Sequence, residues 1–384
     1  MPGKPADEGG QGMIAGRSYQ RLTGEETGCA LLISEAAVFY FTGFYTSARR
    51  PKQVGYTAAW LTERGCELIY PESWEMQIEE MGLSGIDGRI SYKGSVSQFQ
   101  DAVLNLVKRD RPQKLWIEYE AIPLPLYLSV CAAAGSLELV DVTEKLWAMR
   151  QIKTSDEISA LRRAARVAVD AMEYAKRILR PGMRELEVVA EVEYHMRKAG
   201  SMKMPFTMKA MAGDRSAVVT RVPQEYKIRP GDLFLMDFGA VVDGYSSDWT
   251  RTFCVGEPSK AQQELYDFVW DVERRCIGQI RPGVALSVLV EQMEKLAGGH
   301  PFGKFLKTHL GHNVGITSHE PPVIEPGVLG NLQEGMVITI EPGAYIPGLG
   351  GVRIEDEILV TEDGYEILTG LKEEGLAVNG EGNA

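Results

Sequence analysis

The chain has 384 residues, of which 44% are hydrophobic and 24% charged, so it holds enough apolar material for a core in each of two domains. Its formal net charge of −12 argues against nucleic acid or an anionic membrane as the main partner. The five cysteines are scattered and form no CxxC pair, which argues against a disulfide framework or a thiolate zinc site and fits a reducing cytoplasm.

Residues 1–14 are expected to form a flexible tail. The segment is polar and lacks the apolar core of a signal peptide, and no apolar run in the chain approaches the length of a membrane span. We therefore expect a cytoplasmic protein without a membrane partner.

The alternating strand-like and helix-like segments of residues 15–150 predict an α/β domain with a mixed sheet. Two strands are expected around the turn at Arg64-Gly65, and residues 95–109 have the spacing of a helix. Further strands are predicted at four apolar segments: 30–34, 38–44, 114–120 and 137–142.

A second domain, residues 151–376, is predicted to begin with a long helix. Thr154 and Glu157 have the spacing of a capping box, and apolar residues then recur at intervals of three and four. The helix is expected to end near residues 180–182, and a second helix is predicted over residues 185–199.

The second domain contains an internal repeat. The Arg-Pro-Gly tripeptides at 180–182 and at 281–283 are each followed by a helix and then by a Gly-led apolar strand. Asp237 lies six residues after Gly231, and Glu341 lies six residues after Gly335. The equal offset of an acid in an apolar strand favours a duplicated α+β half-domain over chance recurrence of Pro-Gly turns.

Asp237 and Asp248 are expected to lie on the same face of a hairpin. Asp237 interrupts an otherwise apolar strand, where a carboxylate is costly to bury unless it is paired or bound to a cation. Asp243-Gly244 is a strong hairpin turn that makes the two acids diagonal cross-strand neighbours. The alternative for Asp248 is a solvated acid paired with Arg251.

Two further acids and a histidine cluster follow. Glu341 stands in an apolar strand before a Pro-Gly turn, and Glu355 lies in a third strand, where alternation does not decide between it and its two acidic neighbours. Three of the five histidines, His309, His312 and His319, fall within eleven residues of a glycine-flanked loop, where one could bind metal and another could donate hydrogen bonds or shuttle protons. Four carboxylates and one imidazole suit two divalent ions bridged by carboxylates, which hold a nucleophilic water.

These segments resemble the creatinase, prolidase and methionine aminopeptidase family, whose catalytic domain has the pita-bread fold. The motifs occur in family order as MDFGAVVDGYSSDWTRTF, GHNVGITSHEPP, ITIEPGAY and GVRIEDEILVTEDGYEILT. The segment from 138 to 165 is similar to the link that follows a creatinase-type N-terminal domain, and ALLIS with VFYFTGF is similar to the opening of that domain.

The resemblance implies a complete site. It implies a centre of two divalent ions (Mn, Co, Fe or Zn), with Asp248 and Glu355 bridging them. It gives His319 a role in substrate contact and in stabilising the tetrahedral intermediate, Glu341 a role in proton transfer with the bridging water, and Arg353 a place near the substrate carboxylate or the Glu ligands. The implied metal ligands are Asp237, Asp248, His312, Glu341 and Glu355.

The chain departs from the family pattern at two points. Prolidases and aminopeptidases of the family carry a Pro-His pair, whose histidine precedes the first Asp ligand by seventeen residues and reaches the substrate. Here Val219 and Thr220 occupy these positions, which puts ordinary Xaa-Pro cleavage in question, and His309 could compensate. Asn313 replaces the glycine after the His ligand and is expected to narrow the site or add a polar contact.

The resemblance predicts a dinuclear metal-dependent hydrolase that cleaves an amide or peptide-like C–N bond, of Xaa-Pro peptidase type. The alternatives are a specialised small-molecule enzyme on the same scaffold, of the ectoine-type cyclic amidine hydrolase or dimethylsulfoniopropionate lyase kind, or a non-catalytic binding protein. A homodimer is expected. The segment 41–53, with Arg49 and Arg50, is either a loop that reaches a partner's active site or a solvated basic loop.

Overall fold

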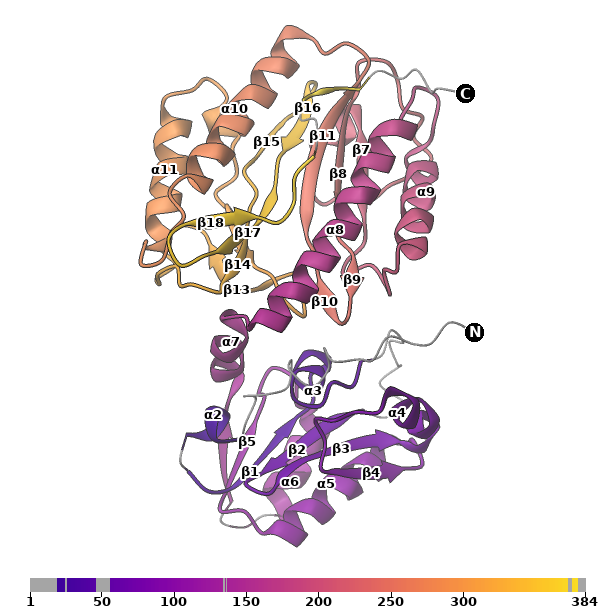
Figure 1. The fold of residues 1–384 in the computed structure, drawn as a ribbon, viewed down its shortest axis with the longest axis vertical. Coiled ribbons are helices and arrows are strands. Elements are labelled where there is room, and N and C mark those ends of the chain that lie inside the picture. The colour runs from indigo at the N-terminus through magenta and orange to yellow at the C-terminus, as the bar shows by residue number, and fades with distance from the viewer. Residues whose placement is uncertain are drawn as a thin grey trace. The chain divides into compact units, whose positions relative to one another are not determined.

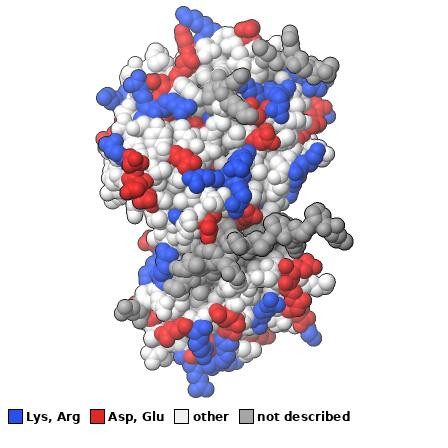
Figure 2. Space-filling model, viewed as in Figure 1, with Lys and Arg blue, Asp and Glu red and all other residues white. Residues whose placement is uncertain are grey.

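The structure, a computed structural model, describes residues 19–24, 26–45, 56–133, 135, 137–371 and 375–378. The chain divides into two compact units between Arg150 and Gln151 (Figure 1). Most of the segment 41–53, with Arg49 and Arg50, lies outside the described residues. Among the helices described, none has both the length and the apolar character that a membrane crossing requires. Acidic and basic side chains both occur across the face shown in Figure 2.

The N-terminal unit contains a six-stranded mixed sheet with the order β4-β3-β2-β1-β5-β6. Its central strand β1 pairs antiparallel with β2 and parallel with β5, so the predicted α/β domain with a mixed sheet is confirmed. The strands are β1 (Cys29–Leu32), β2 (Ala58–Thr62), β3 (Gly65–Pro71), β4 (Gly88–Tyr92), β5 (Lys114–Ile117) and β6 (Glu138–Asp141). The helices are α2 (Tyr19–Thr23), α3 (Glu35–Thr42), η2 (Glu72–Trp74), α4 (Glu75–Met81), α5 (Val96–Asp110), α6 (Leu124–Ala133) and α7 (Thr143–Gln151).

The strand predicted at 38–44 is wrong, because α3 occupies most of this segment. The Ser34 side chain caps the helix by accepting a hydrogen bond from the backbone N–H of Ala37, and Gly43 ends it in the left-handed conformation with φ 73°. Residues 36–42 are all buried. A helix that is buried on every side lacks the 3.6-residue pattern that would distinguish it from a buried strand.

The C-terminal unit encloses strands between two pairs of helices (Figure 1). Helices α8 and α9 share a core with a four-stranded sheet, β19-β11-β8-β7, while α10 and α11 pack on a five-stranded sheet, β13-β12-β14-β17-β18, and on the hairpin β15-β16. The helices are α8 (Ser155–Ile178), α9 (Glu185–Lys198), η3 (Gly213–Arg215), α10 (Lys260–Ile277), α11 (Leu286–Gly298) and η4 (Gly303–Phe305). The strands are β7 (Lys209–Ala212), β8 (Leu233–Phe238), β9 (Val241–Val242), β10 (Tyr245–Ser246), β11 (Trp249–Val255), β12 (Gly311–Asn313), β13 (Glu320–Ile324), β14 (Val337–Ile340), β15 (Gly343–Ile346), β16 (Gly350–Arg353), β17 (Asp356–Val360), β18 (Tyr365–Ile367) and β19 (Ala377–Val378).

The predicted duplication is visible in matched hydrogen bonds. Gly182 donates its backbone N–H to the Ile228 carbonyl over 2.8 Å, and Gly283 donates to the Leu332 carbonyl over 2.8 Å. Each half thus has the same turn, followed by a helix (α9 or α11) and then by a segment that returns to hydrogen-bond with the turn. Gly231 and Gly335 then have φ values of 83° and 84° before strands β8 and β14, which lead to Asp237 and Glu341.

Candidate metal centre

Asp237 and Asp248 come together through the predicted hairpin. Strands β9 and β10 flank the Asp243-Gly244 turn, and β11 then pairs antiparallel with β8 in a register that places Thr250 opposite Asp237. Asp248 lies two residues before Thr250, so it is the diagonal neighbour of Asp237 on the same face. Their exposed fractions are 2% for Asp248 and 4% for Asp237.

Glu355 completes a three-carboxylate group with these two acids. One oxygen from each of Asp237, Asp248 and Glu355 lies within 4.8 Å of the others. Glu355 was expected inside a strand, but it lies between β16 and β17, where an isolated bridge pairs it with Thr250. The Thr250 hydroxyl donates to Glu355 Oε2 over 2.6 Å and fixes that carboxylate.

The acids adjacent to Glu355 are also buried but have structural partners. Asp356 accepts a 2.8 Å hydrogen bond from Arg251, and both side chains are 1% exposed. Glu357 Oε1 accepts the backbone N–H of Asp248 over 2.7 Å. The solvated pairing of Asp248 with Arg251 is therefore wrong, because Arg251 pairs with Asp356 and Asp248 is buried.

His312 lies on the short strand β12 and directs its Nε2 atom toward the acids. Its Nδ1 atom lies 3.1 Å from its neighbour's carbonyl at Asn313, which suits an N–H at Nδ1 and a free lone pair at Nε2. Nε2 lies 3.1 Å from Glu341 Oε1 and 3.7 Å from Asp248 Oδ2, yet this buried atom has no partner with hydrogen-bond geometry. Gly311 allows β12 to lie this close to β14, since a Cβ at Gly311 would meet the Thr339 carbonyl at 2.0 Å.

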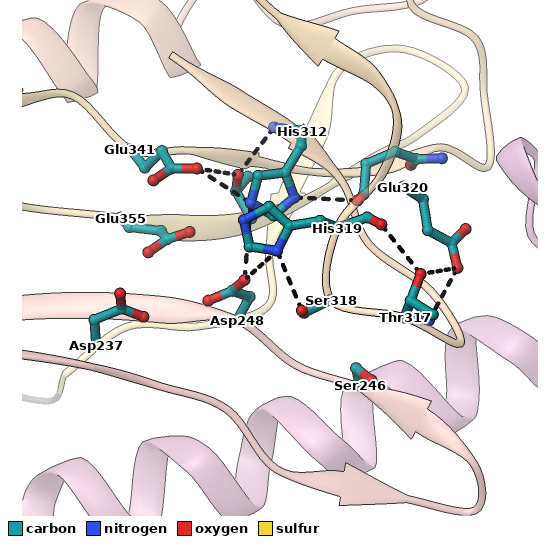
Figure 3. Close-up of polar contacts among 12 residues, drawn as sticks. Asp237, Ser246, Asp248, His312, Thr317, Ser318, His319, Glu320, Glu341 and Glu355 are labelled. Carbon is teal, nitrogen blue, oxygen red and sulfur yellow. Dashed lines mark hydrogen bonds and ion pairs between the residues drawn. The ribbon is translucent and has the colours of Figure 1, made fainter. Parts of the chain in front are cut away.

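The rings of the other two clustered histidines both lie near that of His312, and Figure 3 shows His319 beside it. The His319 ring stacks on His312 with a centroid distance of 3.8 Å, is exposed, and has Nδ1 3.7 Å from Asp248 Oδ2. Half-buried His309 places Nε2 3.1 Å from Glu341 Oε1. The structure therefore gathers His309, His312, His319 and Glu341 around one end of the carboxylate group.

Two cationic side chains reach the same oxygen of Asp237. Buried Arg353 donates from Nη2 to Asp237 Oδ2, and Lys209 Nζ lies 3.1 Å from that atom. Arg353 also donates from Nε to the Thr250 hydroxyl over 2.9 Å and from Nη1 to the Tyr345 hydroxyl over 3.1 Å. Arg353 thus holds Asp237 directly and Glu355 through Thr250.

The buried acids do not share one electrostatic environment. Burial, followed by the charge of Glu355, raises the pKa of Asp248, and burial, followed by the charge of Glu341, raises the pKa of Glu355. Burial also acts on Glu341, but the hydrogen bond with His309 and the nearby Arg353 hold its pKa well below the ordinary value. Bound cations would relieve the repulsion at Asp248 and Glu355.

These observations fit a divalent metal cofactor. The donor set combines hard carboxylate oxygens with imidazole nitrogen, which suits Mn, Fe, Co or Zn. The unpartnered Nε2 of His312 and the buried, mutually repelling carboxylates of Asp248 and Glu355 are groups that a cation would satisfy. The Asp237–Asp248–Glu355 group and the histidine-containing groups form two adjacent sets of donors.

The two departures from the family pattern have different surroundings. Thr220 is exposed in a turn after η3, while the preceding Val219 packs against a cluster that contains Tyr345. Asn313 does not project into the site: its amide accepts from Lys153 Nζ over 2.9 Å and donates to the Pro321 carbonyl over 3.2 Å. Of the two alternatives expected for Asn313, the structure shows the added polar contact, and its partner is the buried Lys153.

Sequence reasoning missed Lys209, Thr250 and Tyr345. Lys209 begins a short apolar strand, and the signal that could have found it is its register opposite Asp237, which depends on pairing β7 with β8. Thr250 could have been found from the hairpin, since the register that places Asp248 also sets Thr250 opposite Asp237. Nothing in the sequence indicates the contact of Tyr345 with Arg353.

Comparisons with known proteins cover nearly the whole chain. A model of metallopeptidase family M24 matches residues 159–362, and one of the creatinase/prolidase N-terminal domain matches residues 17–152. The chain is 34% identical over 339 residues to an uncharacterised peptidase of Bacillus subtilis, which covers 88% of this chain and 92% of that one. Similar solved structures include an X-Pro aminopeptidase from Thermotoga maritima (TM-score 0.84, 27% identity, 94% and 98% coverage) and a prolidase from Pyrococcus horikoshii (TM-score 0.83, 30% identity, 96% and 99% coverage).

Proposed function

Because this chain belongs to metallopeptidase family M24 and carries a creatinase/prolidase N-terminal domain, we propose that it is a dinuclear metal-dependent hydrolase of Xaa-Pro peptide bonds. The observation that carries the proposal is the unpartnered Nε2 atom of buried His312, which faces Glu341 and Asp248. The similarity to an X-Pro aminopeptidase and a prolidase supports the choice of substrate.

The proposed ligands are the five residues implied by the sequence. Two divalent ions held there would activate a water for attack and polarise the scissile carbonyl. Glu341, Asp248 and Glu355 are positioned from three different segments, so the site depends on the complete fold of the C-terminal unit. The full proposed set is Asp237, Asp248, His312, Glu341 and Glu355.

The surrounding residues take three proposed roles. Glu341 has a lowered pKa, so it is ionised at neutral pH and can accept a proton in the reaction. Although the His319 side chain is 63% exposed, desolvation of its ring by surrounding protein atoms, followed by the charge of nearby His312, lowers its pKa to about 4, so the imidazole is neutral and can donate a hydrogen bond to a developing oxyanion. Arg353 is 5% exposed, and we assign it to positioning Asp237 and Thr250 rather than to direct substrate contact.

The test uses a panel of dipeptides with protein stripped of metal and reloaded with Mn²⁺. We expect glycyl-proline to be cleaved by the reloaded protein and not by the stripped one. Glu341→Gln is expected to abolish turnover, while the matched exposed variant Glu362→Gln keeps it. Absence of turnover across the panel with two ions bound would overturn the peptidase assignment.

Thr220 supports a second candidate, a small-molecule enzyme on this scaffold. Its hydroxyl cannot replace an imidazole as a proton donor to the substrate at neutral pH. If Thr220→His creates or raises glycyl-proline hydrolysis by an order of magnitude, the natural substrate differs from an Xaa-Pro dipeptide. Half-buried His309 could supply the missing imidazole, and His309→Ala measures that contribution.

Three further expectations complete the proposal. The native metal is one of Mn, Co, Fe or Zn on the chemistry of the donor set. A homodimer and a cytoplasmic location remain predictions from the sequence. Size-exclusion chromatography with light scattering tests the first of these two, and cell fractionation tests the second.

A further inference from the structure

We propose that Lys209 is a built-in cation of the centre that competes with a metal ion for Asp237. The ion on the Asp237 side is then bound more weakly than it would be without this lysine. The inference rests on the proposed function, because it requires a metal centre at the acid cluster. It concerns how strongly that centre is filled, which neither the family membership nor the ligand set specifies.

The contacts of Lys209 place its charge on a proposed ligand. Lys209 lies on β7 directly opposite Asp237 in the antiparallel pairing with β8. Its Nζ atom is 3.1 Å from Asp237 Oδ2, the oxygen that also accepts from Arg353 Nη2. The Lys209 side chain is 32% exposed, whereas that of Asp237 is 5% exposed. The lysine therefore reaches from the edge of the site into a buried carboxylate.

The two ends of the centre differ in whether a cationic side chain already occupies the ligand atoms. At the histidine end, the Nε2 atom of His312 lies 3.1 Å from Glu341 Oε1, and an Nδ1 atom 3.1 Å from the Asn313 carbonyl leaves Nε2 to offer its lone pair to a cation. At the Asp237 end, one carboxylate oxygen is already shared by an ammonium and a guanidinium. A cation that approaches this end must displace Lys209 or accept its repulsion.

The charge count points the same way. The net charge is −4 for the four ionised acids Asp237, Asp248, Glu341 and Glu355. The positive charge of Arg353 brings this net charge to −3, and that of Lys209 brings it to −2, which a single divalent ion neutralises. Among these six groups, a second divalent ion would then meet no remaining negative charge, whereas without Lys209 it would still meet one.

The expected effect is large enough to measure. A single charge a few ångströms from a divalent ion changes its affinity by more than tenfold, even at an effective dielectric constant of about 20. Lys209 can move toward solvent because it is partly exposed, which reduces the effect. We therefore expect a change of about tenfold.

The experiment titrates the full-length, metal-free protein with Mn²⁺ by calorimetry and counts bound ions by elemental analysis. We expect two binding events in the natural protein, one tight and one weak. Lys209→Met should tighten the weak event about tenfold and leave the tight one unchanged. Lys209→Arg keeps the charge and should keep the weak event. Lys227→Met removes an exposed lysine elsewhere in the same unit and should match the natural protein.

The outcomes separate this inference from the proposed function. If the natural protein binds two ions and Lys209→Met changes neither affinity, or changes both equally, the role of Lys209 is refuted and the metal centre stands. If the natural protein binds no Mn²⁺, both are refuted. A Lys209→Met variant that tightens only the weak event supports the inference whether or not any peptide is cleaved, and one that tightens only the tight event refutes it.

Discussion

Replacing Asp248 by asparagine should stabilise the metal-free protein and destroy its response to metal. The side chain is 2% exposed and lies within 4.8 Å of carboxylate oxygens from Asp237 and Glu355. Its nearest imidazole nitrogens, on His312 and His319, are each 3.7 Å away, which is beyond hydrogen-bond length. Asparagine keeps the shape and removes the repelled charge.

The magnitude follows from the spacing of the charges. Two like charges about 5 Å apart repel by about 3 kcal/mol at an effective dielectric constant of about 20. The pKa of Asp248 is raised by burial and by Glu355, so partial protonation limits this penalty. We expect Asp248→Asn to raise the free energy of unfolding of the metal-free protein by about 1 to 3 kcal/mol.

Metal should reverse the order of stability. A ligand present at about 100 times its dissociation constant stabilises the folded state by about 2.7 kcal/mol for each site. The natural protein should gain this stabilisation, while the variant loses a bridging ligand and should gain much less. The natural protein is therefore expected to be less stable than Asp248→Asn in EDTA and more stable in Mn²⁺.

The assay is the thermal midpoint by scanning calorimetry in EDTA and in Mn²⁺, where roughly 2 to 4 °C corresponds to 1 kcal/mol for a unit of this size. Asp243→Asn is the matched control, because it makes the same change at an exposed position of the same hairpin. The control should shift the midpoint little in either condition. An Asp248→Asn protein that is less stable in EDTA, or equally stabilised by Mn²⁺, would refute the reasoning.

Three further predictions concern pH and the supporting residues. The pKa of Asp248 is raised in the folded state, so the stability that this group contributes is complete below its unfolded pKa and is lost as pH rises through the folded pKa. The gain in thermal midpoint that Asp248→Asn gives in EDTA should therefore shrink as pH falls from 8 to 5. Arg251→Met leaves the buried Asp356 carboxylate without its cationic partner, although Thr369 still donates to it, and should cost about 3 to 5 kcal/mol in denaturant unfolding, whereas a cost below about 1 kcal/mol would contradict the pairing. Thr250→Val removes the hydrogen bond to Glu355 and should weaken Mn²⁺ binding by about 10- to 100-fold in calorimetry; unchanged affinity would show that Thr250 does not orient this carboxylate.

The fold could be predicted from the sequence where local signals agreed with tertiary structure. The capping box of Thr154 and Glu157 marks the start of α8, and the Asp243-Gly244 turn fixes the register that joins Asp237 to Asp248. The prediction failed at α3, because a helix with every residue from 36 to 42 buried carries no amphipathic period.

The candidate site was predictable as a set of residues but not as a charge distribution. The acids of the duplicated strands and the histidine cluster could be identified because carboxylates in apolar strands need a partner. Which of three adjacent acids joins the site depends on the bridge of Glu355 to Thr250, a contact between distant segments. The approach of Lys209 to Asp237 likewise requires the pairing of β7 with β8, for which no local pattern exists.

The most direct test of the central claim is a titration of metal-free protein with Mn²⁺ during hydrolysis of glycyl-proline. We expect no hydrolysis without metal, a rate that rises as ions bind, and a maximum when two ions are bound to each chain. We expect no rise for Asp248→Asn at the same concentrations. Hydrolysis that is independent of Mn²⁺, or its absence when two ions are bound, would contradict a dinuclear metal-dependent peptidase.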